Sequence, residues 1–321
     1  MHVVAALAMA VLFTKSTGPA TRTVRQGRPT SSWGNHMRTH TAATVLSSAV
    51  VLSTLVLPGT AQAAEHSGAA TDLRAFASER VQPQDALGGT TFKNGVVNKG
   101  KDIVLGVTGK KAVPVTFTAF DEEGVAITQA FLWQGTDSSS TDTITGALES
   151  DAYPTCTETP VQGGYSYSCK TVFTIDPAVA FKDGNGTAGT WKVFLGAYDL
   201  YANASYDDDV ARTKIKRAAK LTTNASPEPV REGRTITVTG KLSRANWTTG
   251  KYAGYATQPV QLQFRKRGSS TYTTVKTVKT SSTGTLSITT RAGSDGYYRF
   301  VFAGTTTTGS ATATGDFVDV R

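Results

Sequence analysis

The sequence predicts an all-β protein built from two tandem antiparallel β-sandwich domains. Three observations support this fold class. Short segments in which apolar and polar side chains alternate recur over residues 91–321, and this alternation is the period of a half-buried strand. Turn-forming sequences separate these segments about every 8–12 residues, as in a sandwich. The chain also lacks an uninterrupted apolar run of membrane-spanning length, which is about 18 residues or more.

A secretory signal peptide is predicted over residues 37–63. Arg38 gives it a positive start, residues 45–57 form a mostly apolar stretch, and a Pro–Gly pair followed by Ala-Gln-Ala ends it. This order of charge, apolar run and small residues is the pattern that signal peptidase recognises. Cleavage is expected between Ala63 and Ala64.

Residues 1–36 precede this signal and are expected to be a disordered upstream extension. Residues 1–63 contain five basic and no acidic residues, a charge imbalance that sets them apart from a globular domain. Translation is expected to start at Met37, with Met1 as the alternative start. The mature protein is therefore predicted to be secreted and extracellular, with no membrane association after the signal is removed.

Residues 64–90 are predicted to form a flexible leader, with a short helix over residues 72–80 as the alternative. The first domain follows over residues 91–218. Its stretch 135–150 is rich in Ser, Thr and Asp and predicts a long loop. Strands are expected at 101–107, 113–120, 125–133, 171–175 and 190–195, and in the last of these Trp191, Val193 and Leu195 share one face.

The chain contains two cysteines, Cys156 and Cys169, and a disulfide bond between them is predicted. The segment that separates them contains Gly and Tyr and is typical of a hairpin, and an exported protein folds in an oxidising compartment. Closing a loop of this length stabilises a fold by about 3 kcal/mol. Two cysteines alone are too few for a zinc site.

The second domain is predicted over residues 219–321, where composition and charge change. Residues 64–218 contain 14 basic and 19 acidic residues, a net charge of −5, whereas the second domain contains 14 basic and 5 acidic residues, a net charge of +9. An acidic domain is thus joined to a basic one. Strands are expected at 235–241, 259–266, 271–280, 285–291, 297–303 and 317–320, and in the fifth of these Tyr298, Phe300 and Phe302 point inward.

Several stretches of the sequence resemble a family of secreted Gram-positive soil-bacterial proteins with a C-terminal Ig-like β-sandwich. The motifs SPEPV, YAGY, QFRK and DGYYRF lie in the second domain, and NKGKDIVLGVT, FLWQG and GTWKVFLGAYD lie in the first. Members of this family are mostly of unknown function, and some are labelled calcium-binding. The resemblance implies export and two Ig-like sandwich domains, and it supplies no catalytic residue.

The composition excludes most catalysis that depends on histidine. The chain has four His, and only His66 follows the predicted cleavage site. A Ser-His-Asp triad or a Cys–His pair would have to take its base from this terminal segment, and a zinc site built on several His is excluded. A Gly-rich phosphate loop of the GxxxxGK[ST] form is also missing. The protein is therefore predicted not to be an enzyme and to have no organic cofactor.

Carboxylate chemistry is the catalytic alternative, because a glycosidase needs only two acidic residues on either side of its substrate. Glu122 and Glu123 are adjacent on the turn predicted between the strands that end near residue 120 and begin at residue 125. Adjacent side chains on a turn point in different directions. A small carboxylate-dependent hydrolase therefore stays as an alternative function.

An acidic run in the first domain raises calcium binding as a further alternative. Ca²⁺ prefers six to eight oxygen ligands, which carboxylates and carbonyls supply. The spacing of the acidic residues is not that of an EF-hand, and the other interpretation is a solvated loop. The candidate ligands are Asp199, Asp207, Asp208 and Asp209.

Two segments of the second domain are candidates for ligand binding. The segment NWTTGKYAGY places Trp247, Tyr252 and Tyr255 on one predicted loop, where they either stack on sugar rings or close the end of the sandwich. Arg265-Lys266-Arg267 is a basic hairpin tip that either binds an anionic cell-wall polymer or is simply solvated.

These observations favour a secreted, non-catalytic structural or ligand-binding protein associated with the cell envelope or an extracellular polysaccharide. Nucleic acid is not an expected partner, because the protein is predicted to leave the cell.

Overall fold

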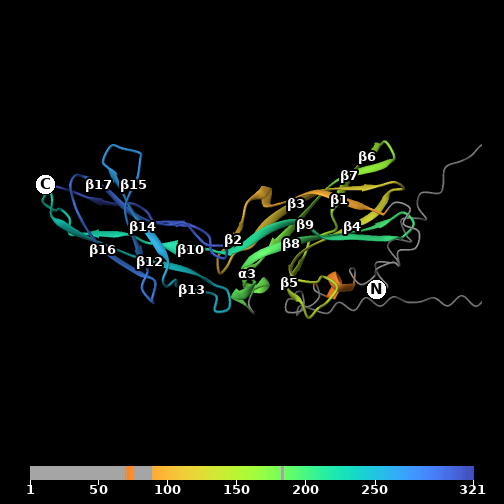
Figure 1. The fold of residues 1–321 in the computed structure, drawn as a ribbon, viewed down its shortest axis with the longest axis horizontal. Helices are drawn as coiled ribbons and strands as arrows, with labels where there is room; N and C mark the ends of the chain where they lie inside the picture. Colours follow the sequence, from red (N-terminus) through yellow and green to blue (C-terminus); the bar gives the residue numbers. More distant parts are fainter. Residues whose placement is uncertain (1–68, 70, 76–88, 182–183) are drawn as a thin grey trace, which may run out of the picture.

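The computed structural model describes residues 69, 71–75, 89–181 and 184–321. The predicted upstream extension, the signal peptide and most of the leader lie outside these residues. The described chain forms two β-sandwiches that lie end to end along the longest axis of the molecule (Figure 1). In this part of the chain no helix combines the length and the hydropathy that a membrane span needs.

The first sandwich is formed by strands β1 (Thr91–Val97), β2 (Ile103–Leu105), β3 (Lys111–Asp121), β4 (Val125–Gly135), β5 (Ile144–Glu149), β6 (Thr155–Val161), β7 (Gly164–Ile175), β8 (Gly189–Asp199) and β9 (Ala204–Arg217). One sheet has the order β1-β3-β7-β6, and the other has the order β2-β9-β8-β4-β5. Neighbouring strands are antiparallel except β2 and β9, which pair in parallel. Three short helices complete this domain. The 3₁₀ helix η1 (Asn98–Gly100) follows β1, and α3 (Pro177–Ala180) and then the 3₁₀ helix η2 (Asn185–Thr187) lie between β7 and β8.

The core of the first sandwich lies between its two sheets. Trp191, Val193 and Leu195 are all buried there, so the prediction that alternate side chains of this strand face inward is confirmed. A smaller cluster lies on the outer side of the β4–β8 pair, where Leu73 from the helical residues 71–75 packs against aromatic side chains. These aromatic residues are Phe131, Trp133 and Phe194.

The second sandwich is formed by β10 (Ala219–Leu221), β11 (Asn224–Ser226), β12 (Thr235–Asn246), β13 (Lys251–Gly254), β14 (Pro259–Lys266), β15 (Thr273–Lys279), β16 (Thr285–Arg291), β17 (Gly296–Phe302), β18 (Ala311–Thr312) and β19 (Asp316–Val318). In one sheet β12 pairs with β10, β11, β13 and β16. The other has the order β15-β14-β17-β18, with β19 also on β17. Tyr298, Phe300 and Phe302 are buried between the sheets, as predicted.

Two local predictions for the first domain are wrong. The stretch 135–150 is not one long loop, because β5 occupies its second half and pairs with β4. The acidic run Asp207-Asp208-Asp209 is not a loop either, because it lies within β9. Asp207 pairs with Leu195 of β8, whereas Asp208 and Asp209 lie where the register between the two strands shifts. Most Ser and Asp residues of the first stretch do lie in the turn over 136–143, and β5 itself contains neither Ser nor Asp.

Candidate binding surface and domain junction

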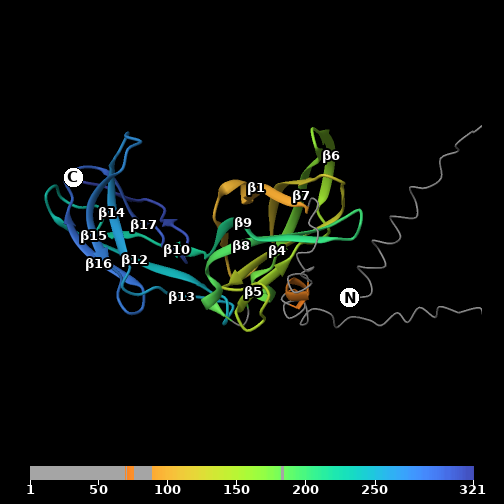
Figure 2. The ribbon, with the colours of Figure 1, turned by 45° about the vertical axis from the view of Figure 1, so that its right-hand side comes forward.

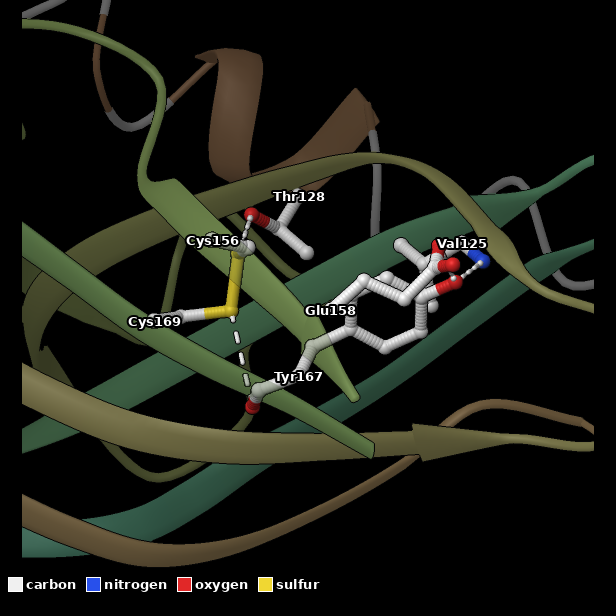
Figure 3. The surroundings of a disulfide bond; sticks show 6 residues. All are labelled: Val125, Thr128, Cys156, Glu158, Tyr167 and Cys169. Carbon is white, nitrogen blue, oxygen red and sulfur yellow. Dashed lines mark hydrogen bonds between the residues drawn. A yellow bond between two sulfur atoms is a disulfide. The ribbon is translucent and has the colours of Figure 1, made fainter. Parts of the chain in front are cut away.

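The disulfide bond between Cys156 and Cys169 is present, which confirms the predicted pairing (Figure 3). The two residues face each other across β6 and β7. Nearby, the hydroxyl of Tyr167 accepts a hydrogen bond from the Val125 N–H at 3.1 Å and donates one to Glu158 Oε2 at 2.9 Å. Burial raises the pKa of Tyr167 to about 12. Tyr167 thus attaches the disulfide hairpin to the start of β4, which indicates a structural role.

Asp199, one of the calcium candidates, is buried and fully engaged in a turn. Its carboxylate accepts hydrogen bonds from the backbone N–H groups of Tyr201 and Asn203, both at 2.8 Å, and from Asn203 Nδ2 at 2.7 Å. A carboxylate that accepts local N–H groups in this way shapes a chain reversal. In the structure Asp199 shapes the β8–β9 turn.

The three aspartates of β9 also point to different partners. Asp208 accepts a hydrogen bond from the Ser138 hydroxyl at 2.9 Å, and Asp209 forms an ion pair with Arg212 that lowers the pKa of its carboxyl. Asp207 accepts the backbone N–H of Asp209 at 2.9 Å. Within the described residues no three His, Cys, Asp or Glu side chains gather as metal ligands would.

A cleft in the first domain contains two acidic residues that the sequence did not single out. Asp72, from the helical residues, and Glu149, at the end of β5, line a cavity of about 640 Å³. Burial raises the pKa of Glu149, and the nearby charge of Asp72 raises it further. By contrast, Glu122 and Glu123 are both exposed on the β3–β4 turn.

The junction between the domains is built around Trp247, which follows β12. Its side chain is only 3% exposed and belongs to the core cluster of the first domain. The indole stacks on Phe181 with ring centres 4.5 Å apart, and its Nε1–H donates to the Gly106 carbonyl at 2.8 Å. Figures 1 and 2 both show the β12–β13 loop beside α3 of the first domain. Trp247 is therefore not an exposed sugar-stacking residue but an anchor between domains.

A polar network surrounds this anchor. Asn185 of η2 accepts the backbone N–H of Trp247 at 2.9 Å and donates through Nδ2 to Asn246 Oδ1 at 2.8 Å and to Thr248 Oγ1 at 3.1 Å. One side chain from the first domain thus satisfies three polar groups of the second.

The main chain also crosses the junction without a flexible linker. The N–H of Ala218 donates to Leu105 O at 2.7 Å, and Ala218 O accepts from Ala245 at 2.8 Å. The buried side chain of Arg217 donates from Nε to Ala245 O at 2.6 Å, and burial lowers its pKa to about 10. Gly309 approaches Val104 so closely that an added Cβ would lie 2.8 Å from a methyl carbon. Ala218 alone separates β9 from β10, and both its N–H and its carbonyl form the backbone hydrogen bonds given above.

The two tyrosines predicted to join Trp247 in ligand binding are half-buried and covered by cations. Lys220 Nζ lies 4.1 Å from the centre of the Tyr252 ring, and the Arg244 guanidinium carbon lies 3.9 Å from that of Tyr255. Tyr252 packs against the core of the first domain, whereas Tyr255 packs on the core of the second. The three aromatic residues therefore do not form one platform.

A different set of side chains does gather on one surface of the second domain. We call it the arginine–tyrosine face and define it by its six partly exposed members. They lie on β14, β17 and β19 and just before β15, in the sheet that does not contain β12. Its members are Gln263, Arg265, Tyr272, Tyr297, Arg299 and Phe317.

Guanidinium groups lie over tyrosine rings throughout this face. The guanidinium carbon of Arg265 is 4.2 Å from the centre of the Tyr297 ring and 5.3 Å from that of Tyr272. The guanidinium carbon of Arg299 is 3.6 Å from the same Tyr272 ring, so one tyrosine is shared by two arginines. Phe317 extends the row, with its ring centre 5.2 Å from that of Tyr297.

The sequence identified only part of this face. Arg265 belongs to it, whereas Arg267 lies at its edge and pairs with Asp295 at 3.4 Å, and Lys266 is exposed at the end of β14. Tyr297 and Arg299 were not predicted, because the alternation of β17 indicates which side chains face inward and does not indicate what the outward ones contact. The signal was present in the alternation of DGYYRF, whose outward positions bear a tyrosine and an arginine.

No family model matches the chain, and no curated protein matches its sequence. Solved structures with some likeness include the fibronectin(III)-like modules of Clostridium thermocellum CbhA, at 11% identity and a TM-score of 0.29 over 72% of this chain and 93% of that one. The D00-D0 domain of Intimin has 13% identity and a TM-score of 0.24, over 71% and 99% of the two chains. The adhesin InvE of Yersinia pseudotuberculosis has 13% identity and a TM-score of 0.24, over 73% and 61%.

Proposed function

We propose that this chain is a secreted, non-catalytic structural protein whose two sandwiches act as one rigid rod. The observation on which this rests is the position of Trp247, a residue of the second domain that is buried in the core of the first. Domains that only share a flexible linker move independently by default. Here an aromatic anchor and backbone hydrogen bonds fix one domain against the other.

Export is part of the proposal and rests on two supports. The sequence contains a complete signal-peptide pattern over residues 37–63, and the folded chain contains a disulfide, which persists mainly in oxidising compartments. The resemblance to secreted Gram-positive soil-bacterial proteins points the same way. Amino-terminal sequencing of protein recovered from the culture medium tests this part. A mature chain that begins at Ala64 is expected, and recovery only from the cytosol contradicts it.

Small-angle X-ray scattering tests the rigid rod. The purified protein is expected to scatter as a single elongated body with one interdomain arrangement. The control is a variant with a short Gly-Ser insertion after Ala218, because such a linker behaves as a flexible coil. The insertion should broaden the distribution of interatomic distances. If the unmodified protein already scatters like the insertion variant, the rigid rod is wrong.

A carboxylate-dependent hydrolase is the second candidate, and one observation favours it. Glu149 and Asp72 line the same cleft, and the pKa of Glu149 is raised by burial and by Asp72, as the proton donor of a glycosidase requires. The test is release of reducing sugar from a panel of polysaccharides by the protein and by Glu149→Gln. Turnover that the variant loses would establish this function and displace the structural one.

A further inference from the structure

We propose that the arginine–tyrosine face of the second domain binds a linear polysaccharide that bears carboxylate groups. This goes beyond the structural role, and it does not depend on the junction. It extends the prediction of an anionic extracellular partner by naming the surface and the chemistry. The residues that would make the contact are Gln263, Arg265, Tyr272, Tyr297, Arg299 and Phe317.

The sheet register places these residues side by side. Gln263 is opposite Arg299 and Arg265 is opposite Tyr297 across β14 and β17, and Tyr297 is opposite Phe317 across β17 and β19. Directly opposed residues on one sheet face have Cβ atoms about 5 Å apart. The face is therefore a continuous strip that runs across the strands. An extended chain is the shape that such a strip accommodates.

The electrostatics of the strip favour an anion. Neither Arg265 nor Arg299 belongs to an ion pair among the described residues. Instead Arg299 donates from Nε and Nη2 to the Gln263 side-chain oxygen at 3.0 and 2.9 Å, and Arg265 donates to the Ser269 carbonyl. A guanidinium has five N–H donors, so each keeps donors for a ligand. The whole domain has a net charge of +9, which attracts a polyanion.

Stacking on tyrosine fixes the orientation of each guanidinium. Each guanidinium lies over a ring, and in Arg299 the Nε–H and one Nη2–H already bond Gln263, so the Nη1 and second Nη2 donors are left to meet a ligand. The planar fork of arginine matches a planar carboxylate with two parallel hydrogen bonds. An arginine held in advance loses less conformational entropy on binding. This geometry distinguishes the face from a set of freely moving surface lysines.

The neutral members of the strip favour a sugar over a simple acidic chain. Tyr297 and Phe317 are partly exposed and offer apolar area for sugar rings. The exposed side chains of Gln261, Thr274 and Thr277 adjoin Gln263 on β14 and β15 and can exchange hydrogen bonds with hydroxyl groups. A polyol phosphate has no ring to pack on the aromatic side chains. A uronic-acid polymer supplies rings, hydroxyls and carboxylates together.

Isothermal titration calorimetry with three polymers tests the proposal. Polygalacturonate has both rings and carboxylates, its methyl ester keeps the rings without the charge, and polyphosphate has charge without rings. The protein, expressed as the full chain, is expected to bind polygalacturonate saturably, and more weakly as salt is added. The two other polymers should bind at least about tenfold more weakly, which corresponds to one lost charged hydrogen bond.

Matched variants assign the binding to the face. Arg265→Gln and Arg299→Gln should each weaken polygalacturonate binding by about tenfold or more. Arg291→Gln removes the same charge from an exposed site on β16, in the opposite sheet, and should leave affinity nearly unchanged. Arg299→Lys keeps the charge and should still weaken binding, because lysine has no planar fork. The melting temperature of each variant shows that it is folded.

Three results would overturn the proposal: absence of polygalacturonate binding at low salt, an equal effect of Arg291→Gln and Arg265→Gln, or tighter binding of polyphosphate. The last would indicate a phosphate polymer. None of these results bears on the scattering that tests the rigid rod, so the two proposals fail separately.

Discussion

Replacing Trp247 with alanine should uncouple the two domains. The change removes a side chain that is 3% exposed, its stacking on Phe181 and its hydrogen bond to the Gly106 carbonyl. Truncation of a buried tryptophan costs about 3–5 kcal/mol. The indole lies between the domains, so most of this loss falls on the contact that joins them. Each sandwich keeps its own core of side chains.

Differential scanning calorimetry measures the effect. The unmodified protein is expected to unfold in one transition, with a calorimetric enthalpy equal to the van't Hoff enthalpy. In Trp247→Ala the transition should split, and the ratio of the two enthalpies should rise to about 2 because two units then unfold separately. Phe300→Leu, deep in the second domain, is the control: it should lower the melting temperature. Two transitions in the unmodified protein, or one in Trp247→Ala, would refute the coupling.

Three further outcomes are expected in the first domain. Replacing Cys156 and Cys169 with alanine removes a link across 13 residues and should lower the free energy of unfolding by about 3 kcal/mol in urea titrations. Because the pKa of Tyr167 is raised from 10 to about 12 in the fold, its neutral form stabilises the protein below pH 10. This stabilisation should be lost as the pH rises from 10 to 12, and Tyr167→Phe should show a smaller loss over that range in thermal melts. Asp199→Ala should lower the free energy of unfolding by about 1.5–3 kcal/mol, because hydrogen bonds to a carboxylate are lost. A calcium chelator should leave the melting temperature of the unmodified protein unchanged. A drop with chelator would restore the calcium interpretation.

The strands that the sequence predicted best are those that contain alternating large apolar side chains. In β17 buried and partly exposed side chains alternate along the whole strand, and β8 keeps the same period from Thr190 to Val193 before both of its faces become buried. The β9 strand was missed because three aspartates in succession are typical of a loop. Its second half does alternate, with buried Thr213, Ile215 and Arg217 separated by lysines, and this was the available signal. The charged side chains on both sides of this segment obscured its two-residue period of buried and exposed positions.

The junction could not be predicted from local patterns. Trp247, Tyr252 and Tyr255 are close in sequence, which suggested a shared surface. Their surroundings are decided by partners far along the chain, such as Gly106, which lies 141 residues from Trp247. The local sequence around a tryptophan beside a turn is the same whether another domain or solvent covers its side chain. The arginine–tyrosine face was only half identified for a related reason, since its residues come from separate strands.

The continuity of β9 and β10 also determines how the molecule responds to tension. A pull on the two ends along the long axis passes through Ala218 into β9, which lies along that axis (Figure 1). The hydrogen bonds between β9 and its neighbours β8 and β2 are then loaded together in shear, whereas a strand pulled sideways would lose them one at a time. We therefore expect the first domain to resist extension at the point where the second is attached.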